Sequence, residues 1–298
     1  MTLPDPLADL TPPADNRRAI LLMVCALFFF AAMDASAKAL SREAGTVMAL
    51  WARYAGQALL VFILVSPRLK SVAKTNFPGL QLARSALLMG ATTCFFFGIS
   101  HIGLAQATAI MDLNPVLITL GAAFFLGETV GPRRMFAIAA ALVGALIIIR
   151  PGGAVFSLWS MLPLGTAVCY AGYTLITRYV GRSEDPWTSL LYAALFGALI
   201  LSAIVPFHWV PLTAYTGGLM VLLAGFGTFG QLLLIRAFTS GEAAMLAPFG
   251  YVGLVFATIF GVVIFGDWPD FWTWIGASVV VASGIYVWHR ERQIRPRD

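Results

Sequence analysis

Long apolar stretches, each ended by proline, glycine or a charged side chain, follow one another along almost the whole chain. There are ten of them. Most reach the roughly 20 residues that a tilted helix needs to cross about 30 Å of hydrocarbon, and a helix satisfies its own backbone where water is absent. The pattern predicts an all-α polytopic membrane protein with ten transmembrane helices. They cover residues 19–40, 46–65, 78–99, 104–127, 132–149, 157–179, 186–207, 212–238, 243–265 and 271–288.

The composition excludes a soluble protein. Of the 298 residues, 59% are hydrophobic and 11% are charged, and the mean hydropathy is +0.84; soluble domains are about half apolar and a quarter charged. The net charge of +5 comes from basic residues between the apolar stretches, which indicates membrane topology and no nucleic-acid partner. The cysteines Cys25, Cys94 and Cys169 lie within apolar stretches, so no disulfide scaffold is expected.

The basic residues also predict the orientation in the membrane. If both termini are cytoplasmic, Lys38, Arg42 and Arg150 fall outside and Arg53 falls within the bilayer. The basic residues that then fall inside are Arg17, Arg18, Arg68, Lys70, Lys74, Arg84, Arg133, Arg134, Arg178, Arg182, Arg236, Arg290, Arg292, Arg295 and Arg297. This asymmetry favours cytoplasmic termini and an even number of spans.

A shift of about 140 residues brings landmarks of the chain into register. The matched pairs are Lys38 with Arg178, Gly144 with Gly284, Arg150 with Arg290 and, at a shift of 139, Gly127–Glu128 with Gly266–Asp267. Because five spans precede the second copy, the two copies enter the membrane from opposite faces. Inverted repeats of this kind predict a site between the halves that opens alternately to the two sides.

This register divides the chain into four parts. Residues 17–150 form the first repeat and residues 151–290 the second, inverted repeat. Residues 1–16, rich in proline and aspartate, are expected to form a disordered cytoplasmic lead, and residues 291–298 a basic cytoplasmic tail that meets the anionic inner leaflet.

Charged residues within the predicted spans concentrate in the first half. An ionised side chain near the bilayer centre costs about 2.5 to 3.5 kcal/mol on insertion scales, so each calls for a partner or a function. Asp34 lies roughly 22 Å from the inner start of its helix, and Arg53 and Asp112 roughly 10 to 12 Å from the outer starts of theirs. Lys38 follows Asp34 by one turn on the same face. These four residues are expected to form an outer gate or to orient a zwitterionic substrate; the alternative is a charge network that only holds helices together.

Proline and polar side chains mark further positions in the spans. Pro115, beside Asn114, and Pro248 interrupt helix hydrogen bonding; they are interpreted as packing kinks or as sources of free backbone groups for a central site. Aromatic walls with a few polar groups suit amphiphilic ligands. The further candidate binding residues are Phe95, Tyr170, Tyr173, Thr174, Phe226, Gln231 and Tyr251.

Several of these landmarks together resemble a known family. The Asp34–Lys38 spacing, residues 51–54 (WARY) and the run from Ala105 through Asn114–Pro115 to Leu126–Glu128 resemble the first half of an EamA-type transporter of the drug/metabolite transporter superfamily. Residues 246–251 (LAPFGY) and 265–269 (FGDWP) resemble its second half. The resemblance implies a ten-helix bundle around a central cavity, lined by helices 1, 3, 4, 6, 8 and 9, that moves amino acids or related metabolites, often outward. Thr174 stands where the repeat would place a counterpart of Asp34, so the ion pairs are not expected to be symmetrical.

Other functions fit less well. No G-x-x-x-x-G-K-[ST] phosphate loop occurs, so an ATP-driven pump is not expected. No H-E-x-x-H motif occurs, and His101, His208 and His289 lie far apart near span ends. An enzyme, a metal site and a cofactor are therefore not expected either. The resemblance to EamA-type transporters implies a bacterial inner-membrane exporter of amino acids, aromatic or large neutral ones among them, acting as a monomer or homodimer. Uptake or exchange of nucleotide-type metabolites or organic cations is the alternative; a channel or a non-transporting scaffold comes after it.

Overall fold

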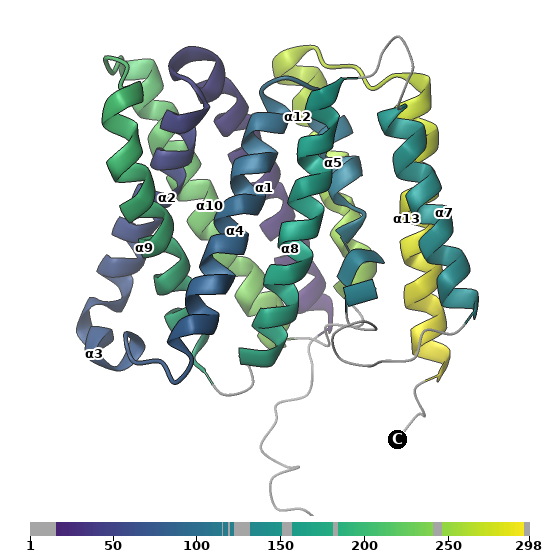
Figure 1. Cartoon of the computed structure of the whole chain (residues 1–298), viewed down its shortest axis with the longest axis horizontal. Helices are drawn as coiled ribbons and strands as arrows, with labels where there is room; N and C mark the ends of the chain where they lie inside the picture. Colours follow the sequence, from purple (N-terminus) through teal and green to yellow (C-terminus); the bar gives the residue numbers. More distant parts are fainter. Residues whose placement is uncertain are drawn as a thin grey trace, which may run out of the picture.

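The computed structural model describes residues 16–114, 116–118, 120–121, 132–150, 157–180, 184–240 and 246–294. The lead before residue 16, the last four residues of the tail and Pro115 lie outside the described residues. The described part is helical, with the long helices packed side by side along one direction (Figure 1).

A helix lies in each of the ten predicted stretches, so the predicted all-helical fold is confirmed. The first half contains α1 (Asn16–Ala44), α2 (Thr46–Val65), η2 (Ser66–Arg68), α3 (Leu69–Val72), α4 (Pro78–Ile99), α5 (Leu104–Met111) and α7 (Pro132–Ile149). The second half contains η3 (Leu158–Ser160), α8 (Met161–Val180), α9 (Pro186–Ile204), η4 (Val205–His208), α10 (Ala214–Ser240), η5 (Ala247–Tyr251), α12 (Val252–Phe265) and α13 (Phe271–Ile294).

The helices have the length and surface of membrane spans. Among the described residues, five helices are long and apolar enough to cross a bilayer; they cover residues 17–44, 46–72, 78–99, 186–208 and 214–237. Shorter apolar helices occur at residues 104–118, 138–149, 249–265 and 271–286. Large apolar side chains such as Phe136, Leu199 and Val263 project from the outside of the bundle, where lipid would cover them. The protein is therefore a multi-pass membrane protein.

The packing pattern shows the inverted repeat. Helix α1 of the first half packs on α10 of the second half. The repeat relates α1 to α8 and α10 to α4, and α8 likewise packs on α4. In the same way, α2 packs on α10 and its repeat equivalent α9 packs on α4. The α2–α9 and α7–α13 pairs join each helix to its own counterpart. Figure 1 shows α1 and α8 running in opposite directions, so the two halves are related by inversion.

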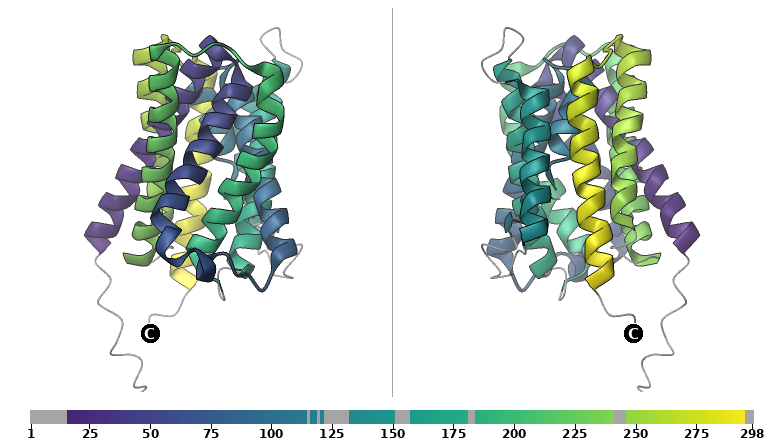
Figure 2. Two further views of the ribbon diagram at one scale, coloured as in Figure 1. Left: turned by 90° about the vertical axis from the view of Figure 1, so that its left-hand side faces the viewer. Right: turned by 90° about the vertical axis from the view of Figure 1, so that its right-hand side faces the viewer.

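The two ends of the bundle are named here for later use. The base holds the start of α1, the end of α13, the connection 66–77 and residues 184–185 (Figures 1 and 2). The apex holds the α1–α2 turn at Gly45 and the connections 100–103 and 266–270. Because both described ends of the chain lie at the base, the number of membrane crossings is even.

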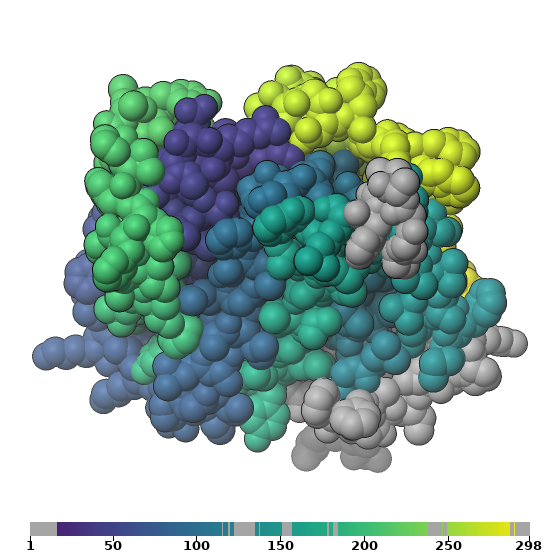
Figure 3. All heavy atoms as spheres, turned by 45° about the horizontal axis from the view of Figure 1, so that its top comes forward, coloured from purple at the N-terminus to yellow at the C-terminus, as the bar shows by residue number. Residues whose placement is uncertain are grey.

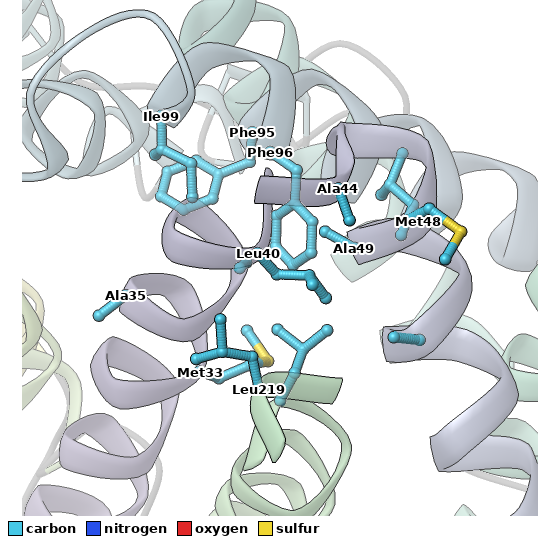
Figure 4. Packing of buried hydrophobic residues seen from close by; sticks show 14 of the residues in the cluster. Met33, Ala35, Leu40, Ala44, Met48, Ala49, Phe95, Phe96, Ile99 and Leu219 are labelled. Carbon is cyan, nitrogen blue, oxygen red and sulfur yellow. The ribbon is translucent and has the colours of Figure 1, made fainter. Parts of the chain in front are cut away.

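A hydrophobic core joins α1, α2, α4 and α10. Figure 4 shows Phe95 and Phe96 of α4 beside Leu40 of α1, with Leu219 of α10 close by. Phe95 is buried in this core, and its role in substrate binding stays a prediction. Its large apolar ring fills the space that small alanines on α1 and α2 leave between the helices.

Glycine allows the closest helix contacts. A Cβ added at Gly197 of α9 would overlap the ring of Tyr54 on α2, and one at Gly144 of α7 would lie 2.9 Å from the carbonyl oxygen of Gly276 on α13. Small residues let membrane helices approach in this way. The glycines therefore determine how tightly the two halves pack along α2–α9 and α7–α13.

The helices that meet across the repeat axis are both irregular. Helix α5 ends at Met111, and Asp112 and Leu113 form a turn before Asn114 is helical again. In the second half Pro248 lies in the 3₁₀ helix η5, which precedes α12. These breaks place polar groups of both repeats near the middle of the bundle.

Candidate functional site

An acid and a base from neighbouring helices interact inside the bundle. Asp34 of α1 and Arg53 of α2 are both half-buried, and their charges interact. The Arg53 Nη1 donates to Gln57 Oε1, while the buried Nε has no hydrogen-bond partner among the described residues. Arg53 therefore keeps a donor for a further anionic or carbonyl group.

Tyrosines connect this pair to α4 and α8. The Tyr54 hydroxyl donates to Thr92 Oγ1 at 3.0 Å. The rings of Tyr170 and Tyr173 lie 5.3 Å apart between centroids at an interplanar angle of 42°, and Tyr173 interacts electrostatically with Arg53. The site thus combines charged groups with an aromatic wall, as a binding site for an amphiphilic metabolite requires.

A second arginine also contacts Tyr173. Arg84 of α4 is only 4% exposed. Its Nε donates to Thr177 Oγ1 at 2.6 Å, its Nη1 to Gln81 Oε1 at 3.2 Å and its Nη2 to the Tyr173 hydroxyl at 3.0 Å. The guanidinium carbon lies 4.8 Å from the centroid of the Tyr173 ring.

Arg84 is a residue whose role the sequence analysis misjudged. It was counted among the basic residues facing the cytoplasm, but its side chain points into the bundle, where oxygens of α8 and Gln81 accept its donors. The available signal was the helical spacing: Gln81 precedes it by three residues on the same face of a predicted span.

A third polar group lies where the repeats meet. The buried Asp112 Oδ2 and Asn114 Oδ1 have no hydrogen-bond partner among the described residues. Asp112 interacts electrostatically with Tyr251, which follows it by 139 residues, one repeat length. Tyr251 also abuts α13, because a Cβ at Gly284 would overlap its hydroxyl.

Lys38, which the sequence analysis grouped with these charges, has its own acid at the apex. Its Nζ lies 2.6 Å from Asp267 Oδ2 and 2.7 Å from the carbonyl oxygen of Ile102, and the side chain is 3% exposed. Asp267 stands between α12 and α13, so this pair links α1 of the first half to the second half. Figure 3 shows the segment after α12, in yellow-green, beside the end of α1, in purple.

A recess opens beside this pair at the apex. It has a volume of about 270 Å³, and Gln106, Asp267 and Trp268 are among its lining residues. At its edge Arg150, which ends α7, pairs with Asp270. Burial alone would raise the pKa of Asp270, but hydrogen bonds from Thr273 and Arg150 outweigh it and lower that pKa.

The base is closed by a network around Glu184. Its Oε1 accepts from Thr75 Oγ1 at 2.5 Å and from the Asn76 N–H at 2.6 Å, and its Oε2 accepts from Gln81 Nε2 at 2.7 Å. Burial alone would raise the pKa of Glu184, but these hydrogen bonds hold it below the usual 4.5. The network joins the α3–α4 connection to the α8–α9 connection.

The remaining predicted residues are less directly involved. Thr174 Oγ1 donates to the Tyr170 carbonyl oxygen at 2.8 Å within α8, so its proton is already used. The Phe226 ring lies 5.8 Å from that of Phe29. Gln231 is half-buried, one turn beyond Gly227, whose added Cβ would lie 3.0 Å from Arg53 Nη1.

Two inverted five-helix halves with polar groups between them are an arrangement that many membrane transporters share. In the described part of the chain, no group of three or more histidine, cysteine, aspartate or glutamate residues could hold a metal ion. The chain belongs to the EamA-like transporter family, whose model matches residues 17–150 and again residues 157–288. The protein is thus a secondary transporter of small metabolites and not an enzyme.

Individual relatives carry different substrates. The chain is 25% identical to a riboflavin transporter of Brucella anthropi over 90% of this chain and 98% of that protein. It is 27% identical to the pseudopaline exporter CntI of Pseudomonas aeruginosa (89% and 94%) and 25% identical to an S-adenosylmethionine uptake transporter of Rickettsia bellii (75% and 77%). A protein of known crystal structure shares the fold with a TM-score of 0.65 and 17% identity, covering 94% of this chain and 99% of that one. Exporters and importers both occur among these relatives.

Proposed function

We propose that this transporter carries small zwitterionic metabolites with an apolar or aromatic part, and that it exports amino acids, aromatic or large neutral ones among them. One observation carries the proposal: Asp34 and Arg53 lie close enough inside the bundle to interact electrostatically, and the buried Arg53 Nε has no hydrogen-bond partner among the described residues. A zwitterion supplies an ammonium for the carboxylate and a carboxylate for the guanidinium.

The aromatic residues contribute the rest of the site. Tyr173 interacts with Arg53 and packs near Tyr170, so an apolar substrate side chain beside the Arg53 guanidinium would meet their rings. Asp112 and Asn114 offer unpartnered oxygens in the helix-break region and complete the candidate site with Tyr251.

Alternating access would use the two closures. The Lys38–Asp267 pair joins the halves at the apex, and the Glu184 network joins them at the base. Opening one while the other holds would expose the site to one side at a time. In this scheme Lys38 serves as a gate residue, separate from the substrate site.

The direction of export requires an orientation, and we place the base in the cytoplasm of a bacterial inner membrane. Arg68, Lys70 and Lys74 gather at the base, in the connection 66–77. At the apex, by contrast, Lys38 and Arg150 are neutralised by Asp267 and Asp270. An excess of lysine and arginine residues in the connections marks the cytoplasmic side.

The proposal is tested by transport of labelled amino acids in proteoliposomes, with and without an imposed pH gradient. Phenylalanine, tryptophan and leucine are expected to move saturably, with trans-stimulation by unlabelled substrate. Asp34→Asn and Arg53→Gln should each lower transport at least tenfold, because each removes one charge partner of the zwitterion. Asp112→Asn tests the third polar group in the same assay.

The matched control is Arg68→Gln, which removes the same charge from an exposed site at the base. If no amino acid moves through well-folded protein, or if Asp34→Asn and Arg53→Gln transport at the wild-type rate, the proposal is wrong. Conductance far above carrier turnover would instead indicate a channel, and no binding or transport of any metabolite would indicate a scaffold.

A second candidate is uptake or exchange of a nucleotide-type metabolite or an organic cation. The relatives named for riboflavin and S-adenosylmethionine support it, and the Tyr170–Tyr173 pair would offer a stacking surface for a heteroaromatic ring. Transport of labelled riboflavin or S-adenosylmethionine, with no amino acid moved in the same vesicles, would favour this candidate.

A further inference from the structure

Arg84 is a buried cation that the scheme above does not use. An arginine side chain stays protonated in proteins, so its charge persists inside the bundle. Burying an ion without a counter-charge is strongly unfavourable. Yet, in the part of the chain that the structure describes, no acidic side chain forms an ion pair with Arg84; its partners are the neutral oxygens of Thr177, Gln81 and Tyr173.

The guanidinium also has unused capacity. It carries five N–H donors in a planar fork, and the three hydrogen bonds named above leave two of them for another acceptor. A fork of this kind matches the two oxygens of a carboxylate. Because the side chain is only 4% exposed, a lipid headgroup on the outside of the bundle cannot reach it.

The position of Arg84 relative to Arg53 indicates a path. Arg53 lies seven residues from the apex end of α2, or roughly 10 Å, and Arg84 lies six residues from the base end of α4, or roughly 9 Å. Tyr173 interacts with both arginines. The two cations therefore lie at different depths, and Tyr173 lies near both.

We propose that Arg84, with Tyr173, is a second binding station for the carboxylate of the transported metabolite, on the base side of the Asp34–Arg53 site. This inference rests on the proposed transport of carboxylate-bearing metabolites. The station is connected to the base closure, because Gln81 accepts from Arg84 through Oε1 and donates to Glu184 through Nε2. A carboxylate held by the two unused donors of Arg84 would therefore lie one side chain away from the base closure.

The test measures binding of benzoate, a minimal aromatic carboxylate, by the thermal stability of the full-length protein in detergent. Benzamide, neutral and of the same shape, is the ligand control. Benzoate should raise the melting temperature of the wild type in a saturable way, and benzamide should not. Arg84→Gln should weaken the apparent affinity for benzoate about ten- to a hundredfold, because a charge-assisted hydrogen bond is lost. Arg68→Gln should leave it unchanged.

Two further variants make each result decisive. Arg84→Lys keeps the positive charge but loses the planar guanidinium that can hold both oxygens of a carboxylate. It should therefore bind benzoate more weakly than the wild type, and it replaces Arg84→Gln in the test if that variant does not fold. Arg53→Gln should retain a benzoate response that depends on Arg84. If the response is absent in the wild type, or if both Arg84 variants bind benzoate as tightly as the wild type, the second station does not exist. If it is lost in Arg53→Gln alone, the Arg84 station is wrong while the proposed Asp34–Arg53 site stands.

Discussion

The apex and the base of the bundle are closed by different kinds of contact. At the apex, Lys38 and Asp267 form an ion pair whose side chains are 3% and 23% exposed. At the base, Glu184 accepts several hydrogen bonds from neutral groups, among them Thr75 and Gln81, at the more exposed connections between helices. At both ends the acid comes from the second repeat and the donor from the first.

The difference shows which closure is harder to break. Removing one member of a buried ion pair leaves an uncompensated charge, whereas a partly exposed hydrogen bond is replaced by one to water. The base is therefore expected to open more readily from this conformation than the apex. At each end the contact joins the two halves, so the proposed motion of one half against the other would break one of the two contacts.

The largest effect is expected from breaking the apex pair. Asp267→Asn leaves the Lys38 ammonium buried with no counter-charge and should lower the free energy of unfolding by about 3 kcal/mol. The measurement is thermal unfolding of the purified protein in detergent.

The control for that change removes both charges. Lys38→Met combined with Asp267→Leu should recover most of the lost stability, because no charge then remains to be desolvated. A single Asp267→Asn protein that melts at the wild-type temperature would contradict a buried ion pair at the apex.

A smaller effect is expected at the base from Gln81→Leu. Gln81 is fully buried and bridges Arg84 to Glu184 and Ser189, so its loss leaves one donor, on Arg84, and two acceptors, on Glu184 and Ser189, without this partner. The expected loss is about 1 to 3 kcal/mol. Labelling of Thr75→Cys by a membrane-impermeant maleimide should also become faster as the base loosens. Equal labelling rates with and without Gln81→Leu would show that this network does not close the base.

Acid should weaken the base through Glu184. Its hydrogen bonds lower its pKa below the usual 4.5, so their stabilisation is complete above that value and is lost as the pH falls through the lowered pKa. The melting temperature should therefore fall on acidification. Asp270 at the apex, whose pKa is also lowered, changes in the same direction. The difference between the wild type and Glu184→Gln isolates the base: if the two curves stay parallel below pH 4.5, Glu184 makes no contribution.

The smallest effect is expected at the exposed apex pair, Arg150–Asp270. The side chains are 25% and 44% exposed, and such pairs contribute about 0.2 to 1 kcal/mol. Arg150 has a backbone φ of 50°, in the left-handed region that asparagine tolerates well. Arg150→Asn therefore removes the charge without adding strain, and a stability loss approaching that of Asp267→Asn would contradict the assignment of the apex closure to Lys38.

The candidate site was predictable only in part, and particular residues show why. Asp34 and Arg53 could be expected near one another, since each is a charged residue in the outer half of a neighbouring span. The partner of Lys38 could not, because Asp267 lies 229 residues away and meets it only through packing of α1 on α12. The interior position of Arg84 was not predicted, because a basic residue near the end of a span is usually assumed to be solvated. The rotation of α4 about its axis instead turns the Arg84 side chain toward Tyr173.

The sequence by itself determined the helices, the multi-pass membrane character and the repeat. The length of each apolar stretch, the distribution of basic residues and the residues that recur after about 140 positions are all visible in the sequence without knowledge of the packing. Only the tertiary structure decided which charges pair, which arginine faces the interior and how each end is closed. Those contacts depend on the rotation and approach of helices from opposite halves, which no single segment encodes.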